Sequence, residues 1–245
     1  MSEQGKKTSI ELSERFEAAF NRIHTTLKRL HKRGDTDVFM ELLHETARKH
    51  ASVRKHLDEL KQYAKLRNAI VHEKTETNYY IAQPHEDIVE RIEAIDQILS
   101  EPAEAMSIAT TPVYTLEPST SLTKVLQMIK ENGYSEYPVY ERGICKGLIT
   151  ARGILCWMTE HHSNSKVDFS QTTVSDILPL ETDHTIAFTD KKATVFDIEY
   201  TFEEHQNKNK KLEAILITQN GTSEELPSGI ITTWDLTKIN EERVD

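Results

Sequence analysis

One short string in the first half of the chain combines residue types that could cleave a phosphodiester bond. It runs from residue 66 to residue 73 and reads LRNAIVHE. A histidine can take or give a proton near neutral pH, and an arginine can hold a phosphate as charge develops on it. Asn68 and His72 are four residues apart and share one helix face, whereas Arg67 and His72 would lie about 140° apart on a straight helix. The string is therefore expected to act only at a helix end or across a bend.

A second pattern, near the end of the chain, suits the binding of a ribose. Asp235 offers a carboxylate, which is a fork of acceptors able to hold both hydroxyls of a ribose diol. Three positions earlier, Thr232 can offer a hydroxyl to phosphate or ribose, and backbone amides that open a helix favour an anion. The alternative is that Asp235 is only a helix N-cap, which would by itself explain T-x-x-D at a strand-to-helix junction.

The elements that must position these residues fall into two parts of different composition. The chain has 245 residues, 30 Lys and Arg, 40 Asp and Glu, and a net charge of −10. Residues 1–100 hold 17 basic and 17 acidic residues, so residues 101–245 hold the other 13 and 23 and carry the whole net charge. Six of the eight glycines and six of the seven prolines also follow residue 100. We therefore expect two domains, residues 1–100 and 101–245.

The first domain is predicted to be an all-α bundle of four or five helices, because apolar residues recur at spacings of three and four. Thr8-x-x-Glu11 predicts a capping box at the start of the first helix, and Gly34 predicts its end. A joint is expected near residues 50–52, and Pro84 suits the first position of the last helix. The first apolar stripe consists of Leu12, Phe16, Phe20, Ile23, Leu27 and Leu30.

The segment between residues 22 and 67 is locally basic, with twelve basic residues against six acidic ones. Such a surface could hold a phosphate backbone, and five interleaved histidines would add charge below about pH 6.5. Lys and Arg on exposed helix faces are also commonly just solvated, so both interpretations stay open. The basic residues are Arg22, Lys28, Arg29, Lys32, Arg33, Arg48, Lys49, Arg54, Lys55, Lys61, Lys65 and Arg67.

The string at residues 66–73 resembles the RNxxxH signature of HEPN domains, small helical bundles that often act as metal-independent ribonucleases. The resemblance implies that Arg67, Asn68 and His72 are catalytic, without a metal, and that two protomers pair their motifs in a homodimer that acts on RNA. One motif supplies one histidine, whereas cleavage through the 2′-hydroxyl commonly wants a base and an acid. The alternative is a buried polar network that joins helices without catalysis, as in non-catalytic relatives.

The second domain contains one unit twice. GLITARGI at residues 147–154 aligns with GIITTWDL at residues 229–236, an offset of 82 residues. Each copy is expected to run from an extended segment through a helix, a buried strand and the G-h-h-T strand into a second helix, in β-α-β-β-α order. The repeats span residues 102–160 and 173–240. Their expected first three elements are 112–116, 120–132 and 136–140, and then 185–188, 192–205 and 213–217.

This order, with G-h-h-T-x-x-D at its end and TVSDIL at residues 173–178 as a lead-in, resembles the CBS domain, and two copies resemble a Bateman module. The fold class implied is α+β and multi-domain, a helical bundle followed by a tandem β-α-β-β-α CBS pair. Such modules bind adenosine-containing ligands and usually regulate an attached domain. The residues implied to hold the ligand are Thr182, Ala214, Ile230, Thr232 and Asp235.

The two copies differ where the ligand would bind. Copy one has Gly153 in place of the ribose carboxylate, so one working site is expected. In copy two Leu216 stands where the family often has proline, and Glu136 of copy one stands where phosphate-binding members have a basic residue. The residues that could substitute for that base are Arg152, Lys191 and Lys192. Because this half is acidic, we expect AMP or ADP as the regulatory ligand, with ATP and S-adenosylmethionine as alternatives.

Other classes of function find little support. No apolar run approaches the roughly 20 residues of a membrane span, and the N-terminus lacks a signal-peptide core, so a soluble, cytoplasmic protein is expected. Cys145 and Cys156 lack metal or CxxC spacing, and there is no HExxH, GxSxG or phosphate loop with Lys, so no metal is expected. His161 is expected to be solvated, and Trp234 to lie in a core or an interface.

The sequence as a whole thus predicts an adenine-nucleotide-sensing regulatory protein in which a CBS pair controls a HEPN-like domain, a candidate endoribonuclease. The alternative is a non-enzymatic nucleotide sensor whose helical domain mediates dimerisation or binds protein or nucleic acid.

Overall fold

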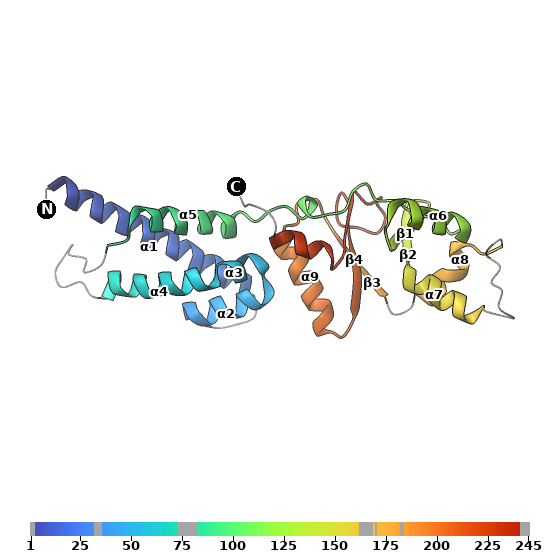
Figure 1. Ribbon diagram of the computed structural model, residues 1–245, viewed down its shortest axis with the longest axis horizontal. Coiled ribbons are helices and arrows are strands. Elements are labelled where there is room, and N and C mark those ends of the chain that lie inside the picture. Colours follow the sequence, from blue (N-terminus) through green and yellow to red (C-terminus); the bar gives the residue numbers. More distant parts are fainter. Residues whose placement is uncertain are drawn as a thin grey trace. The chain divides into compact units, whose positions relative to one another are not determined.

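The computed structural model describes residues 3–31, 36–72, 83–161, 169, 171–181 and 184–240, and their side chains except at residues 3–9, 71, 72, 184, 185 and 240 (Figure 1). The chain divides into two compact units. The first contains the residues up to Ala103 together with the segment from Ile239, and the second runs from Glu104 to Lys238. Gly34, the predicted end of the first helix, lies outside the described residues.

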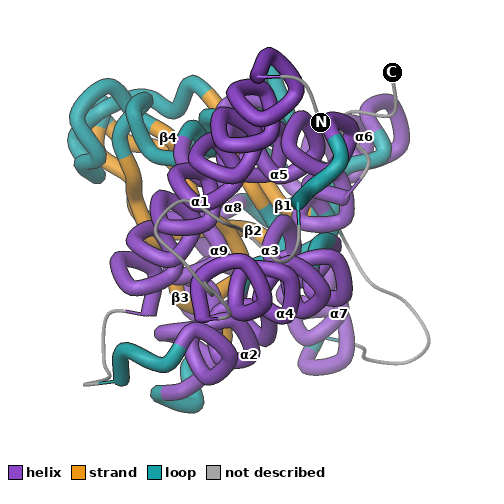
Figure 2. The backbone as a smooth tube through the Cα atoms, turned by 90° about the vertical axis from the view of Figure 1, so that its left-hand side faces the viewer, coloured by secondary structure: helices purple, strands orange, loops and turns teal. Residues whose placement is uncertain are grey.

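The first unit is helical, as predicted. Its described helices are α1 (Glu3–His31), α2 (Phe39–Lys49), α3 (Ala51–Lys55), α4 (Leu57–His72) and α5 (Glu86–Ser100) (Figure 2). His50 separates α2 from α3, in the predicted joint. The expected capping box at Thr8 is wrong, because α1 already begins at Glu3 and Thr8 lies inside it. Pro84 precedes α5 instead of opening it, since His85 is the N-cap.

The apolar stripe of α1 forms the centre of this unit. Phe16, Ile23 and Leu27 are fully buried, and α1 packs along α5, which contributes Ile92, Ile95 and Leu99. The two helices are also joined by two ion pairs. Arg15 donates to both carboxylate oxygens of Glu93, at 3.0 and 2.7 Å, and Arg22 donates to Asp96 at 2.6 Å. Burial of its apolar face, rather than helix propensity, is what mainly stabilises an amphipathic helix such as α1.

The first half of the second unit builds a two-stranded antiparallel sheet. Its elements are η1 (Ala105–Ser107), α6 (Leu122–Asn132), β1 (Glu136–Glu141), β2 (Ile144–Thr150) and α7 (Ala151–Glu160). The side chain of Ser121 caps the N-terminus of α6, and Gly133 ends the helix in the left-handed conformation, with φ of 72°. The extended segment expected at residues 112–116 is reduced to one parallel bridge between Leu116 and Val139.

The second half follows a similar order with a three-stranded sheet, β3-β4-β5. Strand β3 is parallel to β4, and β4 is antiparallel to β5. The expected final α-helix is instead a 3₁₀-helix. The elements are α8 (Val174–Ile177), η2 (Leu178–Leu180), β3 (His184–Thr189), α9 (Val195–Asn207), β4 (Lys211–Ile217), β5 (Gly229–Ile231) and η3 (Asp235–Asn240).

The two halves exchange their lead-in segments. Thr110, in the lead-in of the first half, pairs with Ile230 of β5, and a Cβ on Gly229 would lie 2.9 Å from the Cβ of Ala109. In the other direction, a Cβ on Gly147 of β2 would lie 2.8 Å from Leu178 of η2. The two sheets share a core that includes Tyr140, Leu148, Ala214, Leu216 and Ile230. Each G-h-h-T strand therefore ends beside the lead-in of the other half.

Candidate ligand-binding site

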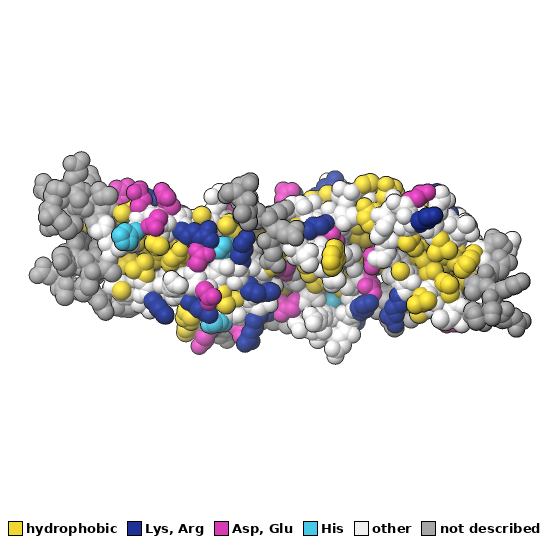
Figure 3. Space-filling view, viewed as in Figure 1, with side chains coloured by type: hydrophobic (Ala, Val, Ile, Leu, Met, Phe, Trp, Pro, Cys, Tyr) yellow, Lys and Arg dark blue, Asp and Glu magenta, His cyan; other side chains and the backbone are white. Residues whose placement is uncertain are grey.

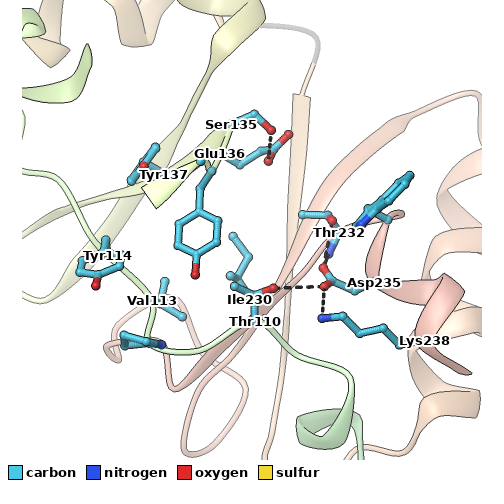
Figure 4. Close-up of a pocket in the computed structure, with 14 residues that line it drawn as sticks. Thr110, Val113, Tyr114, Ser135, Glu136, Tyr137, Ile230, Thr232, Asp235 and Lys238 are labelled. Carbon is cyan, nitrogen blue, oxygen red and sulfur yellow. Dashed lines mark hydrogen bonds and ion pairs between the residues drawn. The ribbon is translucent and has the colours of Figure 1, made fainter. Parts of the chain in front are cut away.

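A pocket of about 360 Å³ opens at the end of β5 (Figure 4). Three segments line it: residues 110 and 112–114 of the first lead-in, residues 133–137 at the start of β1, and Ile230 of β5 with residues 232, 234, 235 and 238 after this strand. The exchange of lead-ins brings these segments together. Three of the predicted ligand residues lie in the wall of this pocket. They are Ile230 of β5, Thr232 in the turn that follows, and Asp235 at the start of η3.

The carboxylate of Asp235 accepts four hydrogen bonds in the pocket wall. Its Oδ2 accepts hydrogen bonds from the backbone N–H of Thr232 at 2.8 Å and from the Thr232 hydroxyl at 2.9 Å. Its Oδ1 accepts from the Thr110 hydroxyl at 3.1 Å and from Lys238 Nζ at 2.7 Å. Figure 4 shows Asp235 between these partners, with Oδ1 on the side of the first lead-in. Asp235 is only 4% exposed.

These contacts keep the Asp235 carboxylate ionised. Burial alone would raise the pKa of Asp235, but hydrogen bonds from Lys238 and Thr232 together outweigh it and hold this pKa below its ordinary value. Four donors fill the roughly four lone-pair sites of a carboxylate, so a ligand hydroxyl would bind Asp235 by replacing one of them.

The bonds between Thr232 and Asp235 are also a capping geometry. Thr173 with Asp176 and Thr194 with Asp197 make the same pair of bonds, from the threonine N–H and hydroxyl to one carboxylate oxygen, at the starts of α8 and α9. Both of those aspartates are exposed, whereas Asp235 is buried and has Thr110 and Lys238 as additional partners. The N-cap interpretation thus describes part of the role of Asp235, and its location in the pocket distinguishes it from the other two.

Aromatic side chains surround the opening of the pocket. Trp234 is 78% exposed and Tyr114 is 41% exposed, and the rings of Tyr114 and Tyr134 lie 6.2 Å apart. Of the two locations expected for Trp234, a core or an interface, the core is therefore wrong, because Trp234 lies exposed in the turn before η3. Val113 and Ile230 add apolar wall. Planar apolar walls with a few fixed polar groups are typical of small-molecule sites.

Few charged groups lie in this pocket. Among the described lining residues these are Glu136, Asp235 and Lys238, and the lysine is already paired with Asp235. Glu136 accepts a hydrogen bond from the Ser135 hydroxyl at 2.7 Å. The predicted basic substitutes Arg152, Lys191 and Lys192 are not part of this lining. The pocket thus has an excess of one negative charge, which opposes a highly anionic ligand.

One predicted ligand residue, Ala214, is not brought to this pocket, because it is fully buried in the core shared by the two sheets. Another, Thr182, lies outside the described residues. Ala214 belongs to the same repeat as Asp235, whereas the exchanged lead-ins pair the end of copy two with the start of copy one. For the same reason the sequence did not identify Thr110, Tyr114 and Lys238; the spacing of Lys238 three residues after Asp235 was the one available signal.

The RNxxxH string lies at the C-terminal end of α4, whose last residue is His72. The side chain of His72 lies outside the described side chains. Arg67 is half-buried, and its Nε is buried without a hydrogen-bond partner among the described residues, while Asn68 is exposed. The helix-end location is the one that the spacing of Arg67 and His72 requires.

Several of the basic residues predicted to meet RNA are paired within the helical unit. Arg22 binds Asp96, Arg48 binds Glu45 and Lys61 binds Asp58. The guanidinium of Arg54 donates to the carbonyl of Ala47 at 2.9 Å. Figure 3 shows the same mixture, with acidic side chains beside the basic ones on the visible face. The local excess of basic residues therefore does not form an unbroken positive surface there.

His161 is exposed, and its ring stacks on Trp157 with centroids 4.6 Å apart. No group of three or more His, Cys, Asp or Glu suited to a metal ion occurs among the described residues. Within the described part of the chain, no helix combines the length and apolarity needed to cross a membrane.

Comparison with known proteins agrees with the geometry of the first half. The family model of the CBS domain matches residues 105–160. No curated protein matches the chain. Solved structures with similar folds include the CBS domain of a membrane protein from Sphaerobacter thermophilus, at 19% identity and a TM-score of 0.44, which covers 62% of this chain and 97% of that one.

A second similar structure is the CBS domain of a bacterial CNNM/CorC family Mg²⁺ transporter in complex with ATP, at 18% identity and a TM-score of 0.44, covering 63% and 99% of the two chains. A third is Hypoxic Response Protein I with two coordinated zinc ions, at 18% identity and a TM-score of 0.40, covering 56% and 98%. At these values the likeness assigns no function to this chain. The family match and the order of helices and strands together identify residues 105–160 as a CBS domain, followed by a segment of similar order.

Proposed function

We propose that residues 104–238 form a CBS pair that binds an adenosine-containing ligand in the Asp235 pocket and that this ligand regulates the helical unit. The observation that carries the proposal is the buried, ionised Asp235 in the wall of an aromatic-lined pocket. Its carboxylate would accept the hydroxyls of a ribose in place of the bonds from Thr110 and Lys238 to Oδ1, and the apolar and aromatic walls suit a purine. The pocket volume of about 360 Å³ lies within the range usual for small-molecule sites, about 300–1,000 Å³.

The charge of the pocket narrows the ligand class. Glu136 and Asp235 contribute two negative charges against the single positive charge of Lys238, which is already bound to Asp235. Each added phosphate would increase the repulsion from Glu136. We therefore expect AMP or ADP to bind more tightly than ATP, and S-adenosylmethionine, whose sulfonium is cationic, remains the alternative to the nucleotides.

Isothermal titration with adenosine, AMP, ADP, ATP and S-adenosylmethionine tests this proposal. Asp235→Asn removes the charge of the acceptor, and we expect it to weaken binding roughly tenfold to a hundredfold. Asp197→Asn is the matched control, because Asp197 makes the same bonds to a threonine outside the pocket. Loss of binding in both variants, or in neither, would contradict the proposal. Tyr114→Ala at the exposed rim provides a second variant if Asp235→Asn does not fold.

For the helical unit we infer a HEPN-like domain with metal-independent ribonuclease activity, in which Arg67 holds the phosphate and His72 moves a proton. The helix-end position of the string and the unpartnered Nε of Arg67 support this inference. Incubation of the full chain with RNA in EDTA, with and without AMP, tests it. His72→Ala is expected to abolish cleavage, and His85→Ala, at an exposed helix N-cap, to leave it unchanged. Cleavage that survives His72→Ala contradicts the catalytic assignment.

The alternative is a non-enzymatic sensor whose helical unit mediates dimerisation or binds a protein or nucleic acid. The local pairing of Arg22, Arg48 and Lys61 favours it, because paired cations attract an RNA backbone less strongly. This alternative predicts ligand binding that is lost in Asp235→Asn and no RNA cleavage with any ligand. Sedimentation measurements at several protein concentrations test the homodimer that both versions expect.

A further inference from the structure

Gly153, the position at which copy one lacks the carboxylate of copy two, is next to a buried glutamate from elsewhere in the chain. Glu181 follows η2, in the lead-in to the second half, and is 9% exposed. Its Oε1 accepts a hydrogen bond from the backbone N–H of Thr150 at 2.6 Å, and its Oε2 accepts from the Thr150 hydroxyl at 3.1 Å. The carboxylate thus binds the threonine that opens α7.

These are the bonds that Asp235 makes in copy two. Thr150 and Thr232 are equivalent residues, 82 positions apart, as are Gly153 and Asp235. In both copies the threonine donates its N–H and its hydroxyl to a carboxylate. The source of the carboxylate differs, because Asp235 lies three residues after its threonine whereas Glu181 lies 31 residues after Thr150.

Glu181 also occupies the space of the side chain that Gly153 lacks. A Cβ on Gly153 would lie 1.9 Å from Glu181 Oε1 and 2.3 Å from its carboxyl carbon, well inside van der Waals contact. Gly153 is buried within α7, and glycine is less favourable than alanine inside a helix. The glutamate gives a physical reason for a glycine in that helix.

The two carboxylates are held by different sets of donors. Thr232 engages one oxygen of Asp235, and the other accepts hydrogen bonds from Thr110 and Lys238 in the pocket wall. In Glu181 both oxygens accept hydrogen bonds from Thr150, one from its backbone N–H and one from its hydroxyl.

We propose that Glu181 is the structural replacement for the carboxylate missing at position 153, and that it fills the first-copy counterpart of the ligand site. Glu181 and Gly153 then depend on each other, because neither the glutamate nor a side chain at position 153 fits while the other is present. A consequence, which rests on the proposed function, is that each chain binds one ligand.

A double-mutant cycle on the full chain tests the mutual dependence. Gly153→Ala must displace Glu181 from Thr150, so we expect it to lower the Tm by about 3–6 °C. In a Glu181→Ala background the same change meets no carboxylate and replaces a helical glycine, so we expect it to raise the Tm by about 1–3 °C. Glu141→Ala, an exposed glutamate on β1, is the control and should leave the effect of Gly153→Ala unchanged. The same sign of effect in both backgrounds overturns the proposal.

Ligand counting supplies a separate readout. Equilibrium dialysis with radiolabelled AMP is expected to find one site per chain in the unaltered protein and a second in Gly153→Asp/Glu181→Ala, which restores Thr150-x-x-Asp. Two sites in the unaltered protein would overturn the filling of the first site. If no variant binds AMP or another adenosine ligand, the proposed function fails, and the sign of the Gly153→Ala effect in the two backgrounds still decides the role of Glu181.

Discussion

A carboxylate bound to a threonine N–H and hydroxyl recurs at four junctions in the described part of the second unit. Asp176, Asp197, Asp235 and Glu181 each supply it. The first turn of a helix leaves backbone N–H groups without intrahelical partners. A carboxylate at this end accepts hydrogen bonds from such groups and interacts favourably with the helix dipole. The motif therefore has a structural role at each site, and a binding role follows only where the carboxylate also faces a pocket.

A second cluster of charge, partly exposed and in the helical unit, joins α4 to α5. Arg91 donates two hydrogen bonds to Glu59, at 2.7 and 2.8 Å, and the Nδ1 of His56 lies 3.3 Å from the same carboxylate. The bonds from Arg91 lower the pKa of Glu59 to about 2. Burial lowers the pKa of His56, which is 4% exposed. The cluster therefore contains an ionised Glu59 and a neutral His56 at neutral pH.

Glu59→Gln is expected to destabilise the helical unit by about 1 kcal/mol at pH 7, after allowance for solvent screening of the half-exposed pair. A carboxylate whose folded-state pKa is depressed stabilises the fold above the unfolded value of about 4.3 and loses this effect as the pH falls towards 2. The difference between the two proteins should therefore shrink from pH 7 to pH 3 in urea denaturation. The control is Glu45→Gln in an exposed pair with Arg48, for which a few tenths of a kcal/mol is expected. A difference that grows in acid contradicts the assignment.

At the scale of elements, the helices and strands that bury a continuous stripe were the predictable part. The structure contains the apolar stripe of α1 and the strands predicted at residues 136–140 and 213–217. They were predictable because the side chains that an element buries give its sequence a regular spacing of apolar residues. Helix starts were less predictable, since α1 extends past Thr8 and α9 begins three residues after Lys192. Contacts with neighbouring elements determine where such helices begin, and the local sequence does not reveal these contacts.

The site was predictable in its residue types but not in its assembly. Thr232, Asp235 and Ile230 could be identified because their motif is local. Thr110 and Tyr114 could not, since they approach Asp235 through an exchange of lead-ins over more than a hundred residues. The role of Glu181 was also hidden, because nothing in the sequence near Gly153 indicates which distant carboxylate fills its place.

The end of α6, which lines the pocket, allows a test of how a helix C-cap contributes to stability. Gly133 is the left-handed C-cap of α6 and lines the pocket, and no atom lies within 4 Å of the place of a Cβ. Gly133→Ala is therefore expected to cost about 1 kcal/mol through backbone conformation alone. Gly133→Asn should cost less, because asparagine tolerates this conformation. Urea midpoints give both values, and equal losses for alanine and asparagine would indicate a steric cause instead.

At the scale of the whole molecule, two separate buried cores predict two separable unfolding transitions. Leu43 of α2 and Leu216 of β4 are both fully buried, one in each unit. Leu43→Ala and Leu216→Ala are therefore a matched pair, each expected to cost about 2–5 kcal/mol. Differential scanning calorimetry should find that each variant lowers a different transition. A single transition lowered equally by both would mean that the units unfold as one.

The same pair of variants separates ligand binding from regulation. AMP bound at Asp235 stabilises the unit that holds it by mass action, so it should raise the transition that Leu216→Ala lowers. Regulation requires more, because a ligand influences a second unit only through a free energy of coupling between them. The transition that Leu43→Ala lowers should therefore also shift with AMP, by less than the first. A shift confined to the second unit would make that unit a ligand-binding module without control over the helices. Loss of both shifts in Asp235→Asn would assign them to the same pocket.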